Sequence, residues 1–201
     1  MVLGEVRRPE VDVAVWRRDL PASLAALRAW AALTNAPSFD RVVTVDSRAI
    51  AEAVSEVPAS LRDALAADVS MLLGTFLAIT GAGHCRLFVG VIRDDKCRKF
   101  HVDAVAMRMV TTYVGPGTEW LPEDIVDRAA LARLNECPSD ANAAIVRDPS
   151  CVVRAQAGDV LMLKGSRDPN AGGRGAVHRS PPLRECEVRL VLIATAGGPP
   201  P

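Results

Sequence analysis

The chain changes character near residue 81, and this change constrains its fold more than any other feature. Ala- and Leu-rich stretches with a helical period come first, and short β-branched runs broken by Gly, Pro and Asp follow. The second pattern is typical of an all-β barrel or sandwich. We therefore predict one α+β domain of 201 residues with a helical N-terminal layer (1–80), a mainly β core (81–196) and a disordered tail (197–201).

Three stretches of the N-terminal layer are predicted to be helices, namely 21–33, 47–57 and 61–80. Ser60 and Asp63 have the spacing of a capping box at the start of the third helix. The apolar residues of this helix recur with a helical period, which predicts one buried face. We expect the helices to cover one face of a sheet as scaffold.

The C-terminal part is predicted to contain seven or eight strands and one helix. The helix is expected at 124–135, and a glycine-rich loop at 165–175. The second and third strands can be continuous. The predicted strands are 86–93, 99–103, 105–114, 118–121, 151–154, 159–163, 176–179 and 187–195.

Charge and cysteine usage narrow the functional classes. The 24 basic residues equal the 24 acidic residues, so nucleic-acid binding would need a local patch and is not expected. The N-terminus has acidic residues and a proline where a secretory signal has an apolar run, and we expect no membrane span. Five widely spaced cysteines without a Cys-x-x-Cys pair predict reduced thiols. We therefore expect a cytoplasmic protein without a structural zinc knuckle.

The histidines His84, His101 and His178 are the only ones in the chain. His101 and Asp103 are two residues apart on a predicted strand, so their side chains are expected on the same face. His178, from a distant strand, would complete a set of two histidines and one carboxylate, which leaves open positions on non-haem Fe(II). The alternative is that His101 and Asp103 form a hydrogen-bonded pair at a strand surface.

The spacing between His178 and a later arginine adds to this pattern. Arg189 comes eleven residues after His178 and begins an apolar strand. The order His-x-Asp, a later His and an Arg about ten residues beyond resembles the Fe(II)- and 2-oxoglutarate-dependent oxygenase superfamily. The resemblance implies a double-stranded β-helix (a cupin-like jelly roll). It also implies Fe(II) ligation by His101, Asp103 and His178, and an Arg189 that anchors 2-oxoglutarate through a charge-assisted pair.

Three further segments carry a closer resemblance. Phe-His-Val-Asp at 100–103, Gly-Pro-Gly-Thr-Glu-Trp-Leu at 115–121 and Gly-Ala-Val-His-Arg-Ser-Pro at 175–181 are similar to a bacterial family catalogued as a domain of unknown function. This resemblance covers most of the chain and implies no particular activity. The substrate and the oligomeric state are not predicted.

Several alternatives remain open at this stage. Arg179 and Arg184 compete with Arg189 as the anchor. Tyr113, the only tyrosine, shares strand parity with His101 and is either a hydrogen-bond donor to the cosubstrate or a core residue. Cys97, four residues before His101, would suit a shared thiolate site only on a helical backbone. The competing function is a non-enzymatic cupin-like protein that binds a divalent metal such as zinc, since this ligand set binds several metals.

Overall fold

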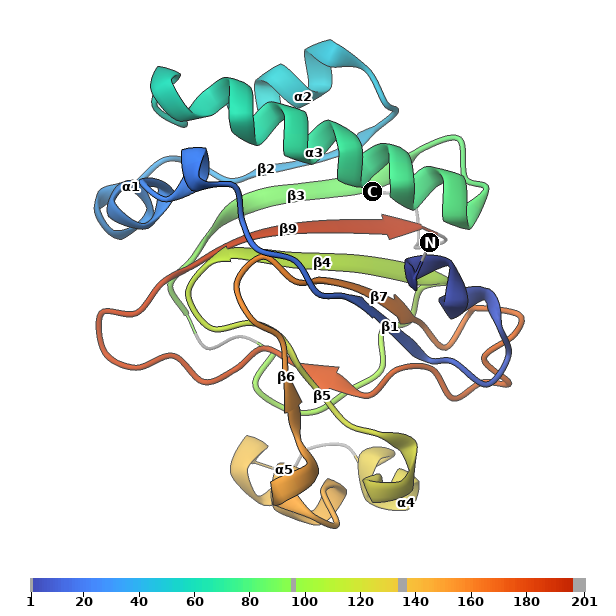
Figure 1. Cartoon of the computed structure of the whole chain (residues 1–201). Helices are drawn as coiled ribbons and strands as arrows, with labels where there is room; N and C mark the ends of the chain where they lie inside the picture. Colours follow the sequence, from blue (N-terminus) through green and yellow to red (C-terminus); the bar gives the residue numbers. More distant parts are fainter. Residues whose placement is uncertain (1, 95–96, 134–136, 197–201) are drawn as a thin grey trace.

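The computed structural model describes residues 2–94, 97–133 and 137–196, so the tail predicted at 197–201 lies outside the described residues. A six-stranded antiparallel sheet with the order β1-β7-β4-β9-β3-β2 dominates the molecule (Figure 1). Strands that are distant in the sequence are neighbours in this sheet. Its strands are β1 (Val13–Trp16), β2 (Phe39–Val43), β3 (Cys85–Ile92), β4 (Met107–Val114), β7 (Val160–Lys164) and β9 (Arg189–Ala196).

A small antiparallel sheet with the order β6-β5-β8 lies beside the large one. Its strands are β5 (Glu119–Trp120), β6 (Val153–Arg154) and β8 (His178–Arg179). An isolated antiparallel bridge joins His178 to His101 and so adds the segment around residue 101 to this sheet. Buried apolar residues that include Val110, Trp120 and Leu161 pack together between the two sheets.

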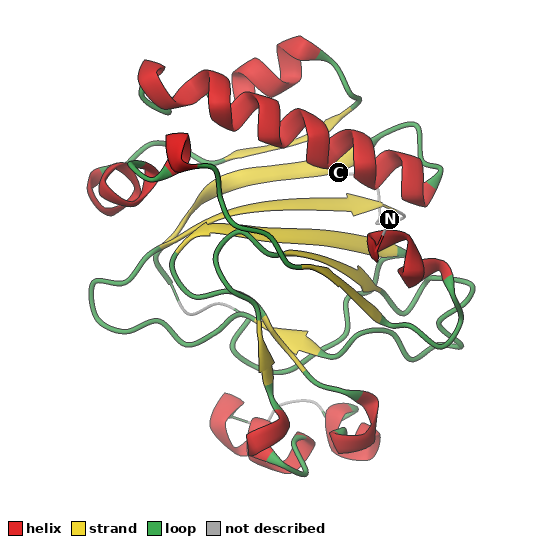
Figure 2. Ribbon diagram, in the orientation of Figure 1, coloured by secondary structure: helices red, strands yellow, loops and turns green. Residues whose placement is uncertain are grey.

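Helices cover one face of the large sheet (Figure 2). These are α1 (Leu27–Leu33), α2 (Ser47–Ala53) and α3 (Ala59–Thr80), whereas α4 (Arg128–Leu131) and α5 (Pro138–Ile145) lie beyond the small sheet. Alternation along β9 separates two environments, because successive side chains of a strand point to opposite faces. Leu190, Leu192 and Ala194 pack in the helix-side core, while Val191 and Ile193 face the other way.

The longest helix, α3, buries the apolar face that its periodicity predicts: Leu61, Leu65, Val69, Leu72, Leu73 and Phe76. The predicted capping box is wrong, because α3 begins at Ala59 after Pro58 and no side chain caps its first turn. By length and composition alone α3 could cross a membrane, but it packs its buried side against the sheet as a core helix does.

The first 80 residues are not purely helical. β1 and β2 form the two edges of the large sheet, where β1 pairs with β7 and β2 pairs with β3. These short runs become strands because neighbouring strands satisfy their backbone groups, a tertiary effect that local propensity does not capture.

Two predictions in the C-terminal part also change. The segment predicted as strand 99–103 forms only the single bridge at His101, and the chain bends before β4. The helix predicted at 124–135 is a short 3-10 turn (Glu123–Ile125) followed by α4, and its last residues lie outside the described part. The helix α5, which was not expected, has a proline at its start, as first turns often do.

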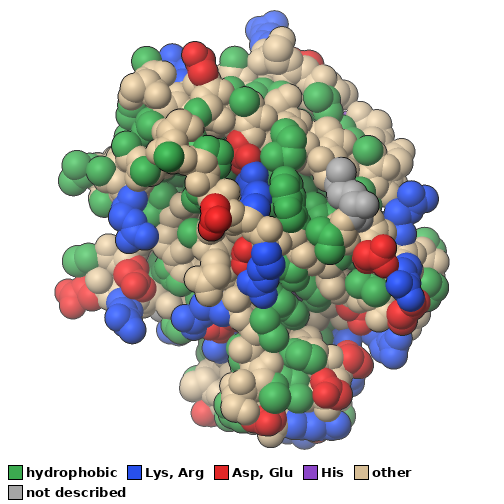
Figure 3. Space-filling model, in the orientation of Figure 1, with side chains coloured by type: hydrophobic (Ala, Val, Ile, Leu, Met, Phe, Trp, Pro, Cys, Tyr) green, Lys and Arg blue, Asp and Glu red, His purple; other side chains and the backbone are tan. Residues whose placement is uncertain are grey.

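The surface in Figure 3 agrees with the balanced charge of the sequence. Lys and Arg side chains on this face are interspersed with Asp and Glu and do not gather into one basic patch. This face of the molecule therefore lacks the electrostatic footprint of a nucleic-acid-binding protein.

Candidate metal centre

Two histidines from segments far apart in the sequence face each other. His101 and His178 each donate their backbone N–H to the other residue's carbonyl at 3.0 Å, and their ring centroids are 4.7 Å apart. Gly175 makes this approach possible. A Cβ on Gly175 would lie 2.7 Å from Val102 Cγ1, and the φ of 68° is in the left-handed region that favours glycine.

Asp103 completes a three-residue cluster with the two histidines. Its Oδ1 lies 3.6 Å from His101 Nε2, and its Oδ2 lies 3.2 Å from His178 Nε2. One ligand atom from each residue falls within 4.8 Å of the others, and the described residues contain no other such group of His, Cys, Asp or Glu. The set expected from the sequence is thus brought together by the fold.

The donor chemistry of the cluster fits a cation. Nδ1 of His101 donates to the Lys99 carbonyl at 2.8 Å and Nδ1 of His178 donates to the Ala176 carbonyl at 3.1 Å, since a carbonyl only accepts. Both rings therefore turn Nε2 toward Asp103, the arrangement that orients metal-binding imidazoles. The buried Oδ2 atom of Asp103 accepts no hydrogen bond of regular geometry from the described residues, although Arg108 Nη1 lies 2.8 Å and His178 Nε2 lies 3.2 Å from it. A divalent ion would satisfy all three acceptors.

The electrostatics of the cluster favour the ionised carboxylate. Burial raises the pKa of Asp103, but His101, His178 and the charge of Arg108 outweigh it and hold that pKa far below its usual range. Burial lowers the pKa of His101, and its contacts with Asp103 and the Lys99 carbonyl raise it by more. A carboxylate ligand is therefore available at neutral pH without deprotonation.

Arg189 lies in the same cavity as the two histidines and is 3% exposed. Its guanidinium donates to the Pro116 carbonyl at 2.8 Å and to the hydroxyls of Thr112 and Thr118 at 3.2 and 3.3 Å. None of the described carboxylates forms an ion pair with it. Burial lowers the pKa of Arg189 to about 10, so it stays charged at neutral pH. A buried guanidinium held only by neutral acceptors is suited to an incoming anion.

The turn between β4 and β5 holds Arg189 in place. Gly115 has a φ of 87°, and a Cβ there would lie 2.2 Å from the Val188 carbonyl oxygen. Only glycine permits this close approach of the turn to the start of β9. The Gly-Pro-Gly sequence therefore brings the carbonyl of Pro116 and the hydroxyl of Thr118 to the guanidinium.

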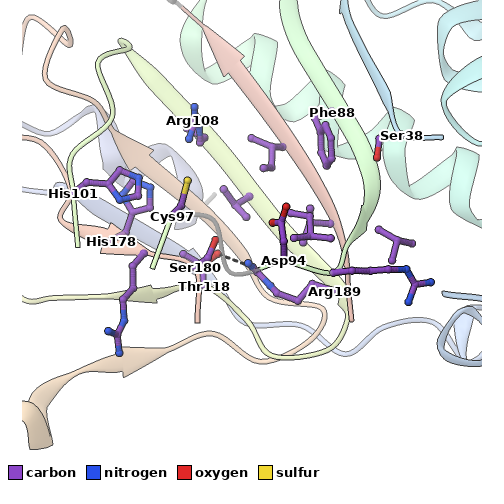
Figure 4. Close-up of a pocket in the computed structure, with 17 residues that line it drawn as sticks. Ser38, Phe88, Asp94, Cys97, His101, Arg108, Thr118, His178, Ser180 and Arg189 are labelled. Carbon is purple, nitrogen blue, oxygen red and sulfur yellow. Dashed lines mark hydrogen bonds between the residues drawn. The ribbon is translucent and has the colours of Figure 1, made fainter. Parts of the chain in front are cut away.

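The cavity has a volume of about 580 Å³, within the range of small-molecule sites. Its floor is formed by apolar side chains of β3, β4 and β9, and its polar groups include both histidines, Cys97 and Arg189 (Figure 4). Cys97 lines the cavity but does not join the three-residue ligand cluster. His84 is exposed on the loop between α3 and β3.

Tyr113 is not a residue of this cavity, contrary to the expectation from its strand parity. Its hydroxyl donates to Asp68 of α3 at 2.7 Å on the helix side of the sheet. The bend between Asp103 and β4 breaks the alternation that would link Tyr113 to His101. Tyr113 therefore belongs to the core, the alternative that the sequence left open.

The two alternative anchors have other positions. Arg179 lines the cavity, but it donates to the buried Glu119 at 2.7 Å and lies over the Phe100 ring. Arg184 lines a separate shallow pocket and not this cavity. Arg189 is thus the anchor candidate that is both inside the cavity and without a carboxylate partner among the described residues.

Sequence reasoning missed Arg108 on β4. Its Nη1 lies 2.8 Å from Asp103 Oδ2, and its side chain lines the cavity. A charged residue within the apolar run Met107–Val114 was the available signal, since a buried strand rarely carries an unpaired cation.

Comparisons with known proteins agree with this geometry. A family model described as protein of unknown function (DUF1826) matches residues 1–194. No curated protein matches the sequence. A dioxygenase for auxin oxidation from rice is similar in structure, with a TM-score of 0.50 and 13% identity over 95% of this chain and 75% of that chain. This likeness shows a shared fold.

Two other solved structures are more distant. A dioxygenase for auxin oxidation from Arabidopsis thaliana, in complex with 2-oxoglutarate, has a TM-score of 0.46 and 10% identity over 81% of this chain and 62% of that chain. The Fe(II)/α-ketoglutarate-dependent dioxygenase TqaL has a TM-score of 0.42 and 16% identity over 87% of this chain and 74% of that chain.

Proposed function

The chain belongs to the family described as protein of unknown function (DUF1826), and we propose that it is an Fe(II)- and 2-oxoglutarate-dependent oxygenase with a double-stranded β-helix core. One observation carries the proposal. A cluster of two histidines and one carboxylate shares a cavity with a buried arginine, Arg189, that has no ion-pair partner among the described carboxylates. The fold shared with the rice dioxygenase supports it.

Each residue of the site has a distinct part in the proposed reaction. His101, Asp103 and His178 hold Fe(II), and the Nδ1 contacts keep both imidazoles in the orientation that ligation needs. Iron, when bound, supplies the centre at which 2-oxoglutarate and oxygen react. Arg189 binds the distal carboxylate of 2-oxoglutarate, and Thr112 and Thr118 orient its guanidinium beforehand.

The apolar floor has a part of its own. Val110, Val191 and Ile193 line the cavity beside the polar groups and limit the water around the reacting atoms. The second substrate is expected to be an organic molecule that fits the remaining volume. We place the protein in the cytoplasm, because its charge is balanced and its cysteines are expected to be reduced.

Binding of 2-oxoglutarate tests the proposal without knowledge of the substrate. We expect anaerobic Fe(II)-loaded protein to bind 2-oxoglutarate in calorimetry and to change its visible absorption on binding. Arg189→Ala should retain the metal and lose the binding, since breaking a buried charge-assisted pair costs about 3–5 kcal/mol. Arg189→Lys should recover only part of it, because a lysine cannot replace the planar fork.

Arg184→Ala is the matched control, because Arg184 lies outside the cavity and should leave 2-oxoglutarate binding unchanged. Slow formation of succinate from 2-oxoglutarate in air gives a second readout. A metal-loaded wild-type protein that neither binds 2-oxoglutarate nor changes its spectrum would refute the oxygenase. The non-enzymatic divalent-metal protein would then be the better assignment, because the same ligands hold zinc.

A further inference from the structure

We propose that the second substrate is a small organic monoanion with an apolar body, and that Arg108 binds its anionic group. The inference rests on the proposed function for the metal and for 2-oxoglutarate. It concerns the part of the cavity at the end of the sheet opposite to Arg189, where the chemistry of the side chains has no other assigned use.

Arg108 and Arg189 lie at opposite ends of the same sheet face. Arg108 of β4 is opposite Thr195 of β9, whereas Arg189 is the first residue of β9. The extended stretch from 189 to 195 spans about 20 Å. Figure 4 shows Arg108 toward the top of the view and Arg189, bonded to Thr118, toward the bottom. A cosubstrate that joins the metal to Arg189 would leave the guanidinium of Arg108 to another molecule.

Two of the four arginines that line the cavity are already engaged. Arg93 donates to the carbonyls of Ala31 and Thr34 at 2.8 and 2.6 Å, beside Asp94 at the rim. Arg179 donates to Glu119, as described above. Of the remaining two, Arg108 contacts Asp103 through Nη1 alone, and the proposed function assigns only Arg189.

Arg108 keeps donors that can bind an anion. Its Nε donates to the Thr195 hydroxyl at 3.4 Å, its Nη1 contacts Asp103, and its Nη2 has no partner among the described residues. A divalent ion on Asp103 would offset the charge of that carboxylate. A dianion such as 2-oxoglutarate would then balance the ion and Arg189. Arg108 would remain a partly buried cation that shares its carboxylate partner with the ion, and an anion that joins it would offset this charge.

The floor next to Arg108 is apolar. Phe88, Ile193 and Val110 are direct neighbours across β3, β9 and β4, one step along the same face from Arg108. Val191 continues this surface on β9. An anionic head on Arg108 would place an apolar body on this row, beside the metal ligands. A polar or cationic substrate would gain nothing from that surface.

Octanoate is a suitable probe, with octanol and octylamine as the neutral and cationic counterparts of the same chain. We expect octanoate, but neither counterpart, to bind the anaerobic Fe(II)-loaded protein in calorimetry, in the presence and in the absence of saturating 2-oxoglutarate. The metal content of every variant is measured first. Arg108→Gln should weaken octanoate about tenfold or more, which corresponds to about 1.4 kcal/mol.

Arg86→Gln is the matched control. Arg86 lies on the same face and in the same row across β3, β9 and β4, but it pairs with Asp40 at the exposed edge and does not line the cavity. This variant should bind octanoate as the wild type does. Phe88→Ala should weaken octanoate more than it weakens butyrate, because the longer chain covers more of the apolar row.

Three results would overturn the proposal. One is octanol or octylamine binding as tightly as octanoate. Another is an Arg108→Gln protein with wild-type affinity for octanoate. The third is displacement of octanoate by 2-oxoglutarate, which would assign the anion to Arg189. Failure of the proposed function is a separate result. It would appear as an absence of 2-oxoglutarate binding, whereas the octanoate titrations test the role of Arg108 independently.

Discussion

At the scale of single residues, the candidate site depends on three side chains whose polar atoms converge. His101 and His178 use their Nδ1–H groups on backbone carbonyls, and Asp103 lies between their Nε2 atoms and the guanidinium of Arg108. A bound cation would be held by both Nε2 atoms and by the ionised carboxylate, so we expect the three residues to act as a unit.

We predict that one divalent metal binds per chain and that His101→Ala, Asp103→Ala and His178→Ala each abolish or greatly weaken binding. Each variant loses one of three ligands, and water replaces it poorly. Metal content after dialysis, measured by atomic emission, checks the prediction. His84→Ala is the control because His84 is exposed and remote from the cluster. Metal loss in Cys97→Ser would instead indicate a thiolate site.

Tyr113→Phe tests the position of the only tyrosine. Burial and the charge of Asp68 raise the pKa of Tyr113 well above its usual value, so its hydroxyl remains a donor to that carboxylate. Losing this bond should lower the free energy of unfolding by about 1.5–3 kcal/mol in urea titrations. The affinity for 2-oxoglutarate should not change. A loss of affinity for 2-oxoglutarate with unchanged stability would instead indicate that Tyr113 contacts the cosubstrate in the cavity.

At the scale of elements, the alternation of β4 and β9 decides which residues reach the site. Even-numbered residues of β4, such as Arg108 and Val110, face the cavity, whereas Met109 packs in the helix-side core. On β9 the same division leaves Arg189 on the cavity face. One bend before β4 sets this register, and a shift by one residue would exchange the two faces.

The helix α3 is joined to the sheet by a buried polar network. Asp68 accepts from Tyr113 and pairs with Arg18, which also donates to the Gly158 carbonyl at 2.8 Å. We predict that Asp68→Ala lowers the free energy of unfolding by about 3–5 kcal/mol, because Arg18 would keep a buried, unpaired charge. Asp63→Ala on the same helix, at an exposed position without a capping bond, should change it by no more than about 0.5 kcal/mol. Urea denaturation of both variants compares the two values, and equal losses would contradict the network.

At the scale of the whole molecule, the candidate metal site lies where two segments that are distant in the sequence form a bridge. His101 lies between β3 and β4 of the large sheet in sequence, and His178 belongs to the small sheet. A bound ion would therefore cross-link the bridge between them and stabilise the folded state by mass action.

We predict that a metal at about 100 times its dissociation constant raises the unfolding free energy by about 2.7 kcal/mol. For a chain of this size that is a rise in the melting temperature of roughly 5–11 °C. Differential scanning calorimetry with and without metal measures the shift. His178→Ala should melt at the same temperature in both conditions. A metal-induced shift that survives in His178→Ala would place the ion elsewhere.

The sequence by itself determined the elements with strong local signals, and it predicted the three residues that the fold brings together as a candidate metal site. The apolar face of α3 follows from its periodicity, and most strands of the β core follow from β-branched runs bounded by turn residues. His101, Asp103, His178 and Arg189 were predicted because their types, order and spacing carry a chemical meaning that does not depend on the exact register.

Only the tertiary structure decided the rest, because it depends on contacts between distant segments. The edge strands β1 and β2 exist through pairing with β7 and β3. The bend before β4 sends Tyr113 into the helix-side core and Arg108 into the cavity, and no local propensity encodes that bend. Side-chain alternation has a period of two, so a single irregular residue reverses every assignment beyond it.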